Sequence, residues 1–201
     1  MASARQGFRL ILASASPRRR ELLAQAGYAF AVEAADVNES EHEDENSAEY
    51  VLRLAEEKAQ AVFARHVTEA EPLVVLGADT TVVCDGEILA KPKDGADAKR
   101  MLRRLSGRTH EVLTGVAIAT SVGLVSGVET TSVTFSAIPE TELDFYCATN
   151  EPMDKAGAYG IQGYAARWIP RIDGDYYNVM GLPIARVVRL IEDALANSQQ
   201  P

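Results

Sequence analysis

An apolar segment followed at once by a capped helix opens the chain and constrains the class of fold. Residues 8–13 form an apolar run typical of a strand. Ser16 and Pro17 then suit the N-cap and first position of a helix, and Gly27 suits the position just past its end. Further along, strand-like runs alternate with segments of helical period. This alternation predicts an α/β fold, with helices on the faces of a sheet.

Three arginines, Arg18, Arg19 and Arg20, lie in the first turn of this predicted helix. A helix N-terminus carries a partial positive charge, so cations gathered there cost stability unless an anion lies among them. Phosphate is the anion expected at such a place. A solvated basic turn on an ordinary helix is the alternative, and the run alone leaves both open.

A second helix is predicted from a cap at Ser47 to about Ala64. Its apolar stripe has a charged residue, Lys58, at one of its positions. Lys58 must either extend its ammonium to solvent or meet an anion, because an unpaired buried charge is costly. The acidic loop before this helix, residues 36–46, contains Glu39 and indicates a solvated charge run. The stripe itself consists of Val51, Leu54, Ala55, Ala59 and Val62.

Residues 73–78 are continuously apolar and predict a strand buried on both faces, which ends at Asp79. Asp85 and Gly86 predict a tight hairpin whose second arm returns toward Lys91. Strict pairing sets Thr80 opposite Lys91, so Asp79 and Lys91 share a face only if a bulge adds one residue. The sequence does not decide between these registers.

The second half of the chain continues with elements of both kinds. Between residues 154 and 163, glycines recur at every third position, which suits either a close approach of backbone to a ligand or a sharp turn. The elements expected around this segment are a helix capped by Asp94 that ends at Ser106 and Gly107, strands at 109–120 and 128–135, a helix at 141–148, and a last helix beginning at Pro183.

Charge and composition exclude several classes of function. The net charge of −9 disfavours nonspecific nucleic-acid binding, so a polyanion would need a local basic cluster or a metal ion. No apolar stretch reaches the length of a membrane span. Cys84 and Cys147 are far apart, which favours reduced thiols and a cytoplasmic setting.

The remaining candidates form a dispersed set of phosphate-binding groups and two carboxylates. Carboxylates near a phosphate cluster indicate Mg²⁺ or Mn²⁺, which prefer carboxylate, water and phosphate oxygens. Phosphoryl transfer needs mainly positioning and charge stabilisation, so a hydrolase of a phosphate ester or anhydride is the leading class. The donors are Ser14, Ser16, Arg18, Arg19, Lys58 and Lys91, and the carboxylates are Glu39 and Asp79.

Five ordered segments resemble the Maf family of nucleoside triphosphate pyrophosphatases. The resemblance implies a mixed, elongated sheet flanked by helices, similar to that of inosine triphosphatases, in one domain at 8–195 with two lobes around a central cleft. It also implies hydrolysis between the α and β phosphates with a divalent cation, a cytoplasmic location and a homodimer. The segments are residues 14–19, 77–80, 91–92, 105–110 and 154–163.

The resemblance also implies a role for each candidate residue. Asp79 corresponds to the proton acceptor that activates water, and Glu39 to a carboxylate that binds the metal together with Asp79. The residues implied to clamp the triphosphate are Arg18, Lys58 and Lys91, with Ser14 and Ser16 as nearby donors. Those implied to set substrate choice are Arg19, Thr80 and Gln162.

Thr80 and Gln162 match the branch of the family that prefers dTTP and UTP, a preference that extends to modified pyrimidine nucleotides. A primary amide offers one donor and one acceptor, which complement the N3–H and O4 of uracil or thymine. Two alternatives are kept: the sister branch that acts on 7-methyl-GTP, and a nucleotide-binding regulator of septum formation that performs no hydrolysis.

Overall fold

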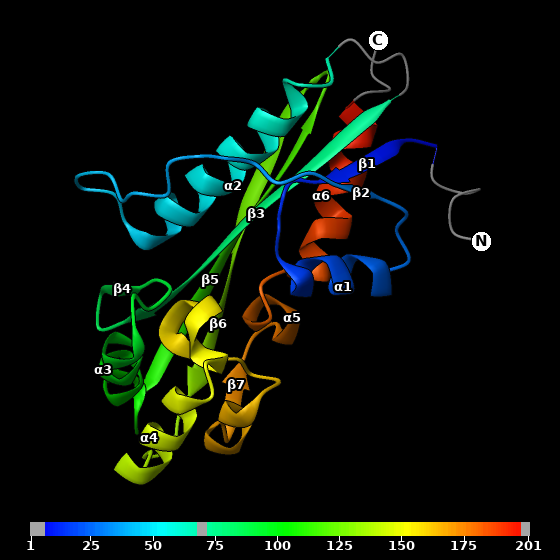
Figure 1. Cartoon of the computed structure of the whole chain (residues 1–201). Helices are drawn as coiled ribbons and strands as arrows, with labels where there is room; N and C mark the ends of the chain where they lie inside the picture. Colours follow the sequence, from blue (N-terminus) through cyan, green and yellow to red (C-terminus); the bar gives the residue numbers. More distant parts are fainter. Residues whose placement is uncertain (1–6, 68–71, 198–201) are drawn as a thin grey trace. The chain divides into compact units, whose positions relative to one another are not determined.

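The computed structural model describes residues 7–67 and 72–197, which form a seven-stranded sheet flanked by helices (Figure 1). The strands are β1 (Arg9–Leu12), β2 (Ala31–Val32), β3 (Leu73–Cys84), β4 (Glu87–Leu89), β5 (Thr109–Thr120), β6 (Gly123–Thr134) and β7 (Arg171–Asp173). The α-helices are α1 (Pro17–Gln25), α2 (Ser47–Phe63), α3 (Gly95–Leu105), α4 (Glu140–Ala148), α5 (Tyr176–Val179) and α6 (Ile184–Asn197). Three short 3₁₀ helices are η2 (Glu151–Asp154), η3 (Ala156–Ala158) and η4 (Tyr164–Trp168).

The sheet is mixed. Its order is β2-β1-β3-β5-β6-β7, and β4 pairs with β3. Strand β1 is parallel to both β2 and β3, whereas the β3–β4 and β6–β7 pairs are antiparallel. The predicted α/β class, with a mixed sheet flanked by helices, is confirmed.

The chain divides into two compact units. Unit 1 contains Met1–Asp79, Thr114–Glu129 and Gly181–Pro201, and unit 2 contains Thr80–Leu113 and Thr130–Met180. Strands β3, β5 and β6 therefore contribute residues to both units, and β3 passes from one to the other between Asp79 and Thr80. The single domain with two lobes and a cleft stays a prediction.

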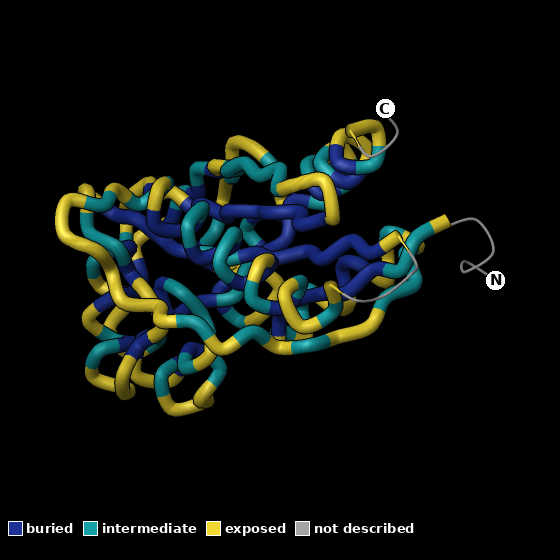
Figure 2. Tube along the Cα trace, turned by 90° about the horizontal axis from the view of Figure 1, so that it is seen from above, coloured by how far each residue is buried: buried dark blue, intermediate teal, exposed yellow. Residues whose placement is uncertain are grey.

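In unit 1, helix α2 packs with its backbone directly against the sheet. A Cβ on Gly77 of β3 would lie 2.1 Å from the carbonyl oxygen of Ala55, and one on Gly115 of β5 would lie 2.1 Å from that of Val51. Only glycine allows this approach. The apolar stripe predicted for α2 faces the sheet as expected, since its five residues are all buried. Figure 2 shows the buried stretches of chain in dark blue and the exposed stretches in yellow.

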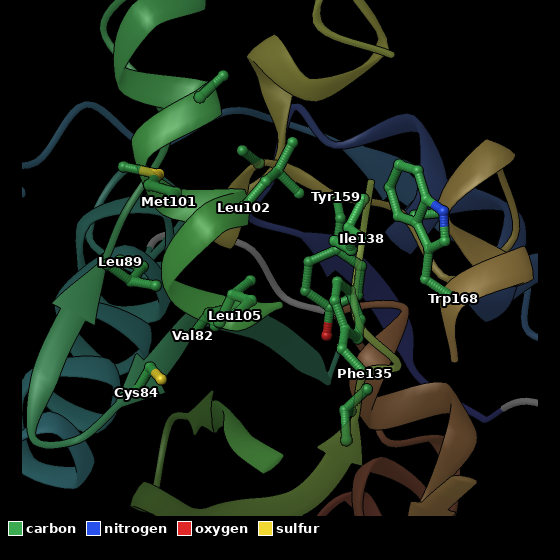
Figure 3. Packing of buried hydrophobic residues seen from close by; sticks show 14 of the residues in the cluster. Val82, Cys84, Leu89, Met101, Leu102, Leu105, Phe135, Ile138, Tyr159 and Trp168 are labelled. Carbon is green, nitrogen blue, oxygen red and sulfur yellow. The ribbon is translucent and has the colours of Figure 1, made fainter. Parts of the chain in front are cut away.

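Unit 2 has its own core, centred on α3. Met101, Leu102 and Leu105 belong to one cluster of buried residues that also includes Phe135 and Tyr159 (Figure 3). Inside this core His110 contacts both aromatic rings edge-on, and its Nε2 lies 2.8 Å from the Tyr159 hydroxyl. Two of the segments that carry the family resemblance, around residues 110 and 159, thus meet in the core of unit 2.

Most predicted element boundaries are confirmed, with two corrections. Ser16 caps α1 and Gly27 follows its end at φ +84°. Helix α2 is capped by Asn46 rather than Ser47, because Asn46 and Glu49 form a reciprocal capping box. Strand β6 begins at Gly123 rather than Val128, and Gly127 within it leaves room for the Arg186 guanidinium, which would lie 2.8 Å from a Cβ there.

The predicted hairpin at Asp85 and Gly86 is confirmed, in the strict register. Cys84 pairs with Glu87 and Val82 with Leu89, with no bulge between them. The ladder ends at Leu89, two residues before Lys91. Within the described ranges, no helix combines the length and apolar character needed to cross a membrane.

Candidate active site

Lys58 connects the two carboxylates that the sequence singles out. Its Nζ donates to Oε1 of Glu39 at 2.6 Å and to Oδ1 of Asp79 at 2.7 Å. The Lys58 and Asp79 side chains are only 10% and 13% exposed, whereas Glu39 is 53% exposed. Of the two possibilities left open for Lys58, the ammonium meets anions instead of extending to solvent.

The close packing of α2 on β3 explains why these residues meet. Gly77 lies against the backbone of α2 between Ala55 and Ala59, and a Cβ there would be 2.7 Å from the Ala59 nitrogen. Lys58 precedes Ala59, and Asp79 lies two residues beyond Gly77 on the strand. Asp79 and Thr80 are the two partly exposed residues of an otherwise buried β3. The glycine thus brings the lysine of the helix to the aspartate of the strand.

Arg19 links the start of α1 to strand β3 by a hydrogen bond. Its Nη1 donates to the backbone oxygen of Ala78 at 2.8 Å and to Oγ of Ser14 at 3.3 Å, and its Nε donates to the oxygen of Gly181 at 2.8 Å. Burial lowers the pKa of the guanidinium, an effect that the nearby charge of Asp79 opposes. The side chain holds the backbone beside Asp79, a function that the sequence did not suggest.

The two serines predicted as phosphate donors both accept hydrogen bonds at the start of α1. Ser16 Oγ accepts from the Arg19 backbone N–H at 3.4 Å, as the N-cap of α1. Ser14 Oγ accepts from the Ser16 N–H at 3.2 Å as well as from Arg19. Arg18 is partly buried on the first turn of α1, and its charge acts on that of Arg19.

The acidic loop that carries Glu39 is held against α2. Arg53 donates to both carboxylate oxygens of Glu45, at 2.6 and 2.8 Å, and to the backbone oxygen of Ser40 at 3.1 Å. Hydrogen bonding to Arg53 lowers the pKa of Glu45 to about 2. The Tyr50 hydroxyl donates to the backbone oxygen of Glu39 at 3.0 Å. The interpretation of this loop as a solvated charge run is therefore wrong for Glu45, whose side chain is buried.

The charge around Asp79 is negative enough to affect its neighbours. Burial raises the pKa of Tyr50 to about 12, and the charges of Asp79, Glu39 and Glu41 act in the same direction. Lys58 supplies the cation between Asp79 and Glu39. A phosphate chain could approach such a place only with further positive charge.

The donor set fits the divalent cation predicted from the sequence. Glu39 and Asp79 both reach one ammonium, so their oxygens converge on one point. Mg²⁺ is commonly held by one or two carboxylates together with substrate phosphates and water. Among the described residues, no group of three or more His, Cys, Asp and Glu side chains could hold a metal without a substrate.

The other three predicted site residues belong to unit 2. Thr80 is partly exposed on β3, and Lys91 is exposed just after β4. Gln162 is exposed in the turn between η3 and η4, where the Gly163 N–H donates to the Gly160 oxygen at 3.0 Å. The structure thus brings together Ser14, Ser16, Arg18, Arg19, Glu39, Lys58 and Asp79 within unit 1.

These observations define an α/β protein with a mixed sheet and a cluster of acidic and basic side chains at a helix start. The chain belongs to the Maf family, since the family model described as Maf-like protein matches residues 9–194.

Curated relatives cover nearly the whole chain. A protein of Koribacter versatilis named dTTP/UTP pyrophosphatase is 52% identical over 188 residues, which are 94% of this chain and 95% of that protein. Proteins with the same name from Bacillus cytotoxicus and Vibrio parahaemolyticus are 52% and 48% identical, over 90% and 92% of this chain and 93% and 97% of their own lengths. These relatives are thus named as hydrolases of nucleoside triphosphates.

One solved structure aligns over 96% of this chain and 98% of its own, at 16% sequence identity and a TM-score of 0.47. It is the nucleoside-triphosphatase / dITP/XTP pyrophosphatase of Mycobacterium abscessus.

Proposed function

We propose that this protein hydrolyses dTTP and UTP, and modified pyrimidine nucleotides of the same shape, to the monophosphate and pyrophosphate. The observation that carries the proposal is the ammonium of Lys58 placed between Glu39 and Asp79. A lysine held by two carboxylates can exchange them for phosphate oxygens when substrate and metal arrive, so one place can bind a polyphosphate together with its cation. The names of the relatives support the same substrates.

Asp79 is the proton acceptor in this mechanism. A water oxygen forms a bond to one of the phosphorus atoms that flank the α–β bridging oxygen, and the bond from that phosphorus to the bridging oxygen breaks. Attack at the α phosphorus expels pyrophosphate with the bridging oxygen, and attack at the β phosphorus expels the nucleoside monophosphate with it, so both routes give the same two products. The proton of the attacking water passes to the Asp79 carboxylate, whose Oδ1 Lys58 holds until substrate binds. Arg19 keeps the backbone next to Asp79 in place through the Ala78 oxygen.

The charge of the triphosphate is neutralised by Arg18, Lys58 and Lys91, as the family resemblance implies. Mg²⁺ or Mn²⁺ held by Glu39 and Asp79 would polarise a phosphoryl oxygen and favour ionisation of the attacking water. Gln162 and Thr80 select the base, since the amide of Gln162 complements the N3–H and O4 of uracil or thymine.

The proposal includes a cytoplasmic homodimer. Cys84 and Cys147 are both free thiols, which suits a reducing compartment.

The test is pyrophosphate release from a panel of nucleoside triphosphates with Mg²⁺ and with EDTA. We expect turnover of dTTP and UTP, its loss in EDTA, and at least a hundredfold lower kcat in Asp79→Asn with nucleotide binding retained. Asp144→Asn, at an exposed carboxylate on α4, is the matched control and should leave kcat unchanged.

Other outcomes of the panel would contradict the proposal. Preferential turnover of 7-methyl-GTP would assign the protein to the sister branch of the family. Nucleotide binding without any pyrophosphate release, equal in wild type and Asp79→Asn, would favour a regulator of septum formation.

A further inference from the structure

Both ends of the turn that carries Gln162 are linked to the carboxylate of Glu151, through the Tyr146 hydroxyl at the start and directly at the end. At its start, the backbone N–H of Gly160 donates to the hydroxyl of Tyr146, which in turn donates to Oε1 of Glu151 at 3.1 Å. At its end, the backbone N–H of Tyr164 approaches Oε2 of Glu151 at 3.4 Å. Both ends of a five-residue segment thus depend on one side chain of η2.

Gly163 shows how closely Glu151 lies against this turn. Its φ of −94° is accessible to any residue, so backbone conformation does not require glycine here. A Cβ on Gly163 would instead lie 1.8 Å from Oε1 of Glu151 and 2.6 Å from its Cδ. The glycine is therefore needed for contact with the carboxylate. This contact resolves part of the glycine pattern, which the sequence attributed either to a ligand or to a sharp turn.

Glu151 is itself held from the opposite side. The ammonium of Lys155 donates to the Glu151 backbone oxygen at 2.6 Å and to Oδ1 of Asp154 at 2.6 Å. The Lys155 side chain also fills the space beside Gly160, where a Cβ would lie 2.8 Å from its Cε. Lys155 thus fixes the backbone of η2 against the first glycine of the turn.

Tyr146 is suited to transmit this restraint. Its side chain is fully buried, and burial together with the charge of Glu151 raises the pKa of its hydroxyl, which stays protonated and able to donate. Its ring stacks on that of Tyr164, with centroids 5.8 Å apart and planes at 18°. The start and the end of the turn are thus coupled through ring contacts as well as through Glu151.

We propose that Glu151 is a positioning residue for base selection, which holds the turn of residues 160–164 so that the Gln162 amide is presented in one orientation. The inference rests on the proposed function, because it assumes that Gln162 reads the base. Gln162 is exposed and is the third residue of the turn 160–163, which the bond from the Gly163 N–H to the Gly160 oxygen closes. The backbone of this turn therefore sets where the Gln162 amide points. An amide that can rotate away selects weakly between uracil and cytosine, whose N3 and C4 groups exchange donor for acceptor.

The experiment compares kcat and KM for dTTP and dCTP in wild type, Glu151→Ala and Tyr146→Phe. The ratio of kcat/KM for dTTP to that for dCTP should fall about tenfold in both variants, the scale of one lost hydrogen bond to a charged group. The change should lie mainly in KM for dTTP, because the catalytic carboxylate is untouched. Glu140→Gln, which removes an exposed carboxylate of α4 that binds Arg103, should keep the wild-type ratio.

Two further measurements separate positioning from mere stabilisation. Gln162→Ala should lower the ratio by itself, and the double variant Glu151→Ala/Gln162→Ala should lower it no further, because the two residues act through one contact. Amide hydrogen exchange at residues 160–164 should be faster in Glu151→Ala than in wild type. If Glu151→Ala does not fold, Glu151→Gln and Tyr146→Phe take its place, since each keeps the shape of the side chain.

The results distinguish a failure of the proposed function from a failure of this inference alone. A wild-type enzyme that does not hydrolyse dTTP removes the proposed function, and the inference with it. A wild-type enzyme that prefers dTTP, together with Glu151 variants that are less stable but equally selective, overturns the inference alone. Unchanged selectivity in Gln162→Ala would also overturn it, because the turn would then not read the base.

Discussion

Lys58 shows how much a single side chain can decide. The sequence established that a lysine interrupts an apolar stripe but not whether it reaches solvent or an anion. The outcome depends on Asp79 and Glu39, which are distant in sequence and come together only when α2 packs on β3. The same ammonium occupies the point where the two carboxylates converge, so the divalent cation that we propose would have to compete with it.

Metal binding by the nucleotide-free protein should therefore be stronger without this lysine. Lys58→Met leaves Glu39 and Asp79 without their cation, and we expect it to bind Mn²⁺ at least tenfold more tightly than wild type, measured by electron paramagnetic resonance of free Mn²⁺. Lys99→Met is the matched control, because Lys99 bridges Asp144 and Glu140, which are 67% and 59% exposed. It should show no comparable gain. Equal Mn²⁺ affinities of wild type and Lys58→Met would contradict the competition.

His110 makes stability depend on pH. Burial lowers its pKa to about 4, below the value of about 6.5 expected in the unfolded chain. The unfolded state therefore binds the proton first as the pH falls, and stability that is present above pH 6.5 is lost between about 6.5 and 4. The maximum effect is about 3 kcal/mol, from about 1.4 kcal/mol per pKa unit.

Urea unfolding between pH 7.5 and 4.5 measures this effect. His110→Gln should be less stable than wild type at pH 7.5, since the contact with Tyr159 is altered, but its stability should fall less steeply with acid. His42→Gln, at an exposed position, should keep the wild-type slope. The same slope in His110→Gln would show that another group titrates.

At the scale of elements, the contact between α2 and β3 positions the candidate active site. Gly77→Ala should push α2 outward, because the new Cβ would lie 2.1 Å from the Ala55 oxygen and the backbone there cannot rotate away. We expect a loss of about 2 kcal/mol of unfolding free energy and a lower kcat, since Lys58 and Asp79 lie on the two separated elements.

Gly95→Ala is the matched control for this prediction. Gly95 begins α3, and a Cβ there would meet nothing within 4 Å. This variant should be as stable as wild type or slightly more stable, since alanine is the better helix former. If chemical denaturation finds Gly77→Ala equally stable, the helix can shift without cost and the close packing does not position the site.

The elements that could be predicted are those with local determinants. The side chains of Ser16 and Asp94 cap helices α1 and α3, as the sequence indicated, and the hairpin at Asp85 follows its turn chemistry. Strand β6 was predicted too short, because its first part includes Gly127, where the missing side chain leaves room for Arg186. Local patterns do not contain such tertiary contacts.

The same distinction applies to the candidate site at the scale of the molecule. Arg18, Lys58 and Asp79 carry charge where the pattern of the chain does not expect it, so the sequence alone singles them out as candidates. Arg19 could be found but not its bonds to backbone oxygens, and Glu151 and Tyr146 could not be found at all, because their importance lies in which backbone groups they reach. The residues at which β3, β5 and β6 pass from one unit to the other could not be predicted either, since no linker separates the units.

Strands β3, β5 and β6 each supply residues to both units, so unit 1 is assembled from three stretches of chain and unit 2 from two. No single truncation of the gene can yield either unit complete, and no single recombination event can replace one with that of a relative. A hybrid that takes one unit from a relative would therefore need several exchanges of chain at once.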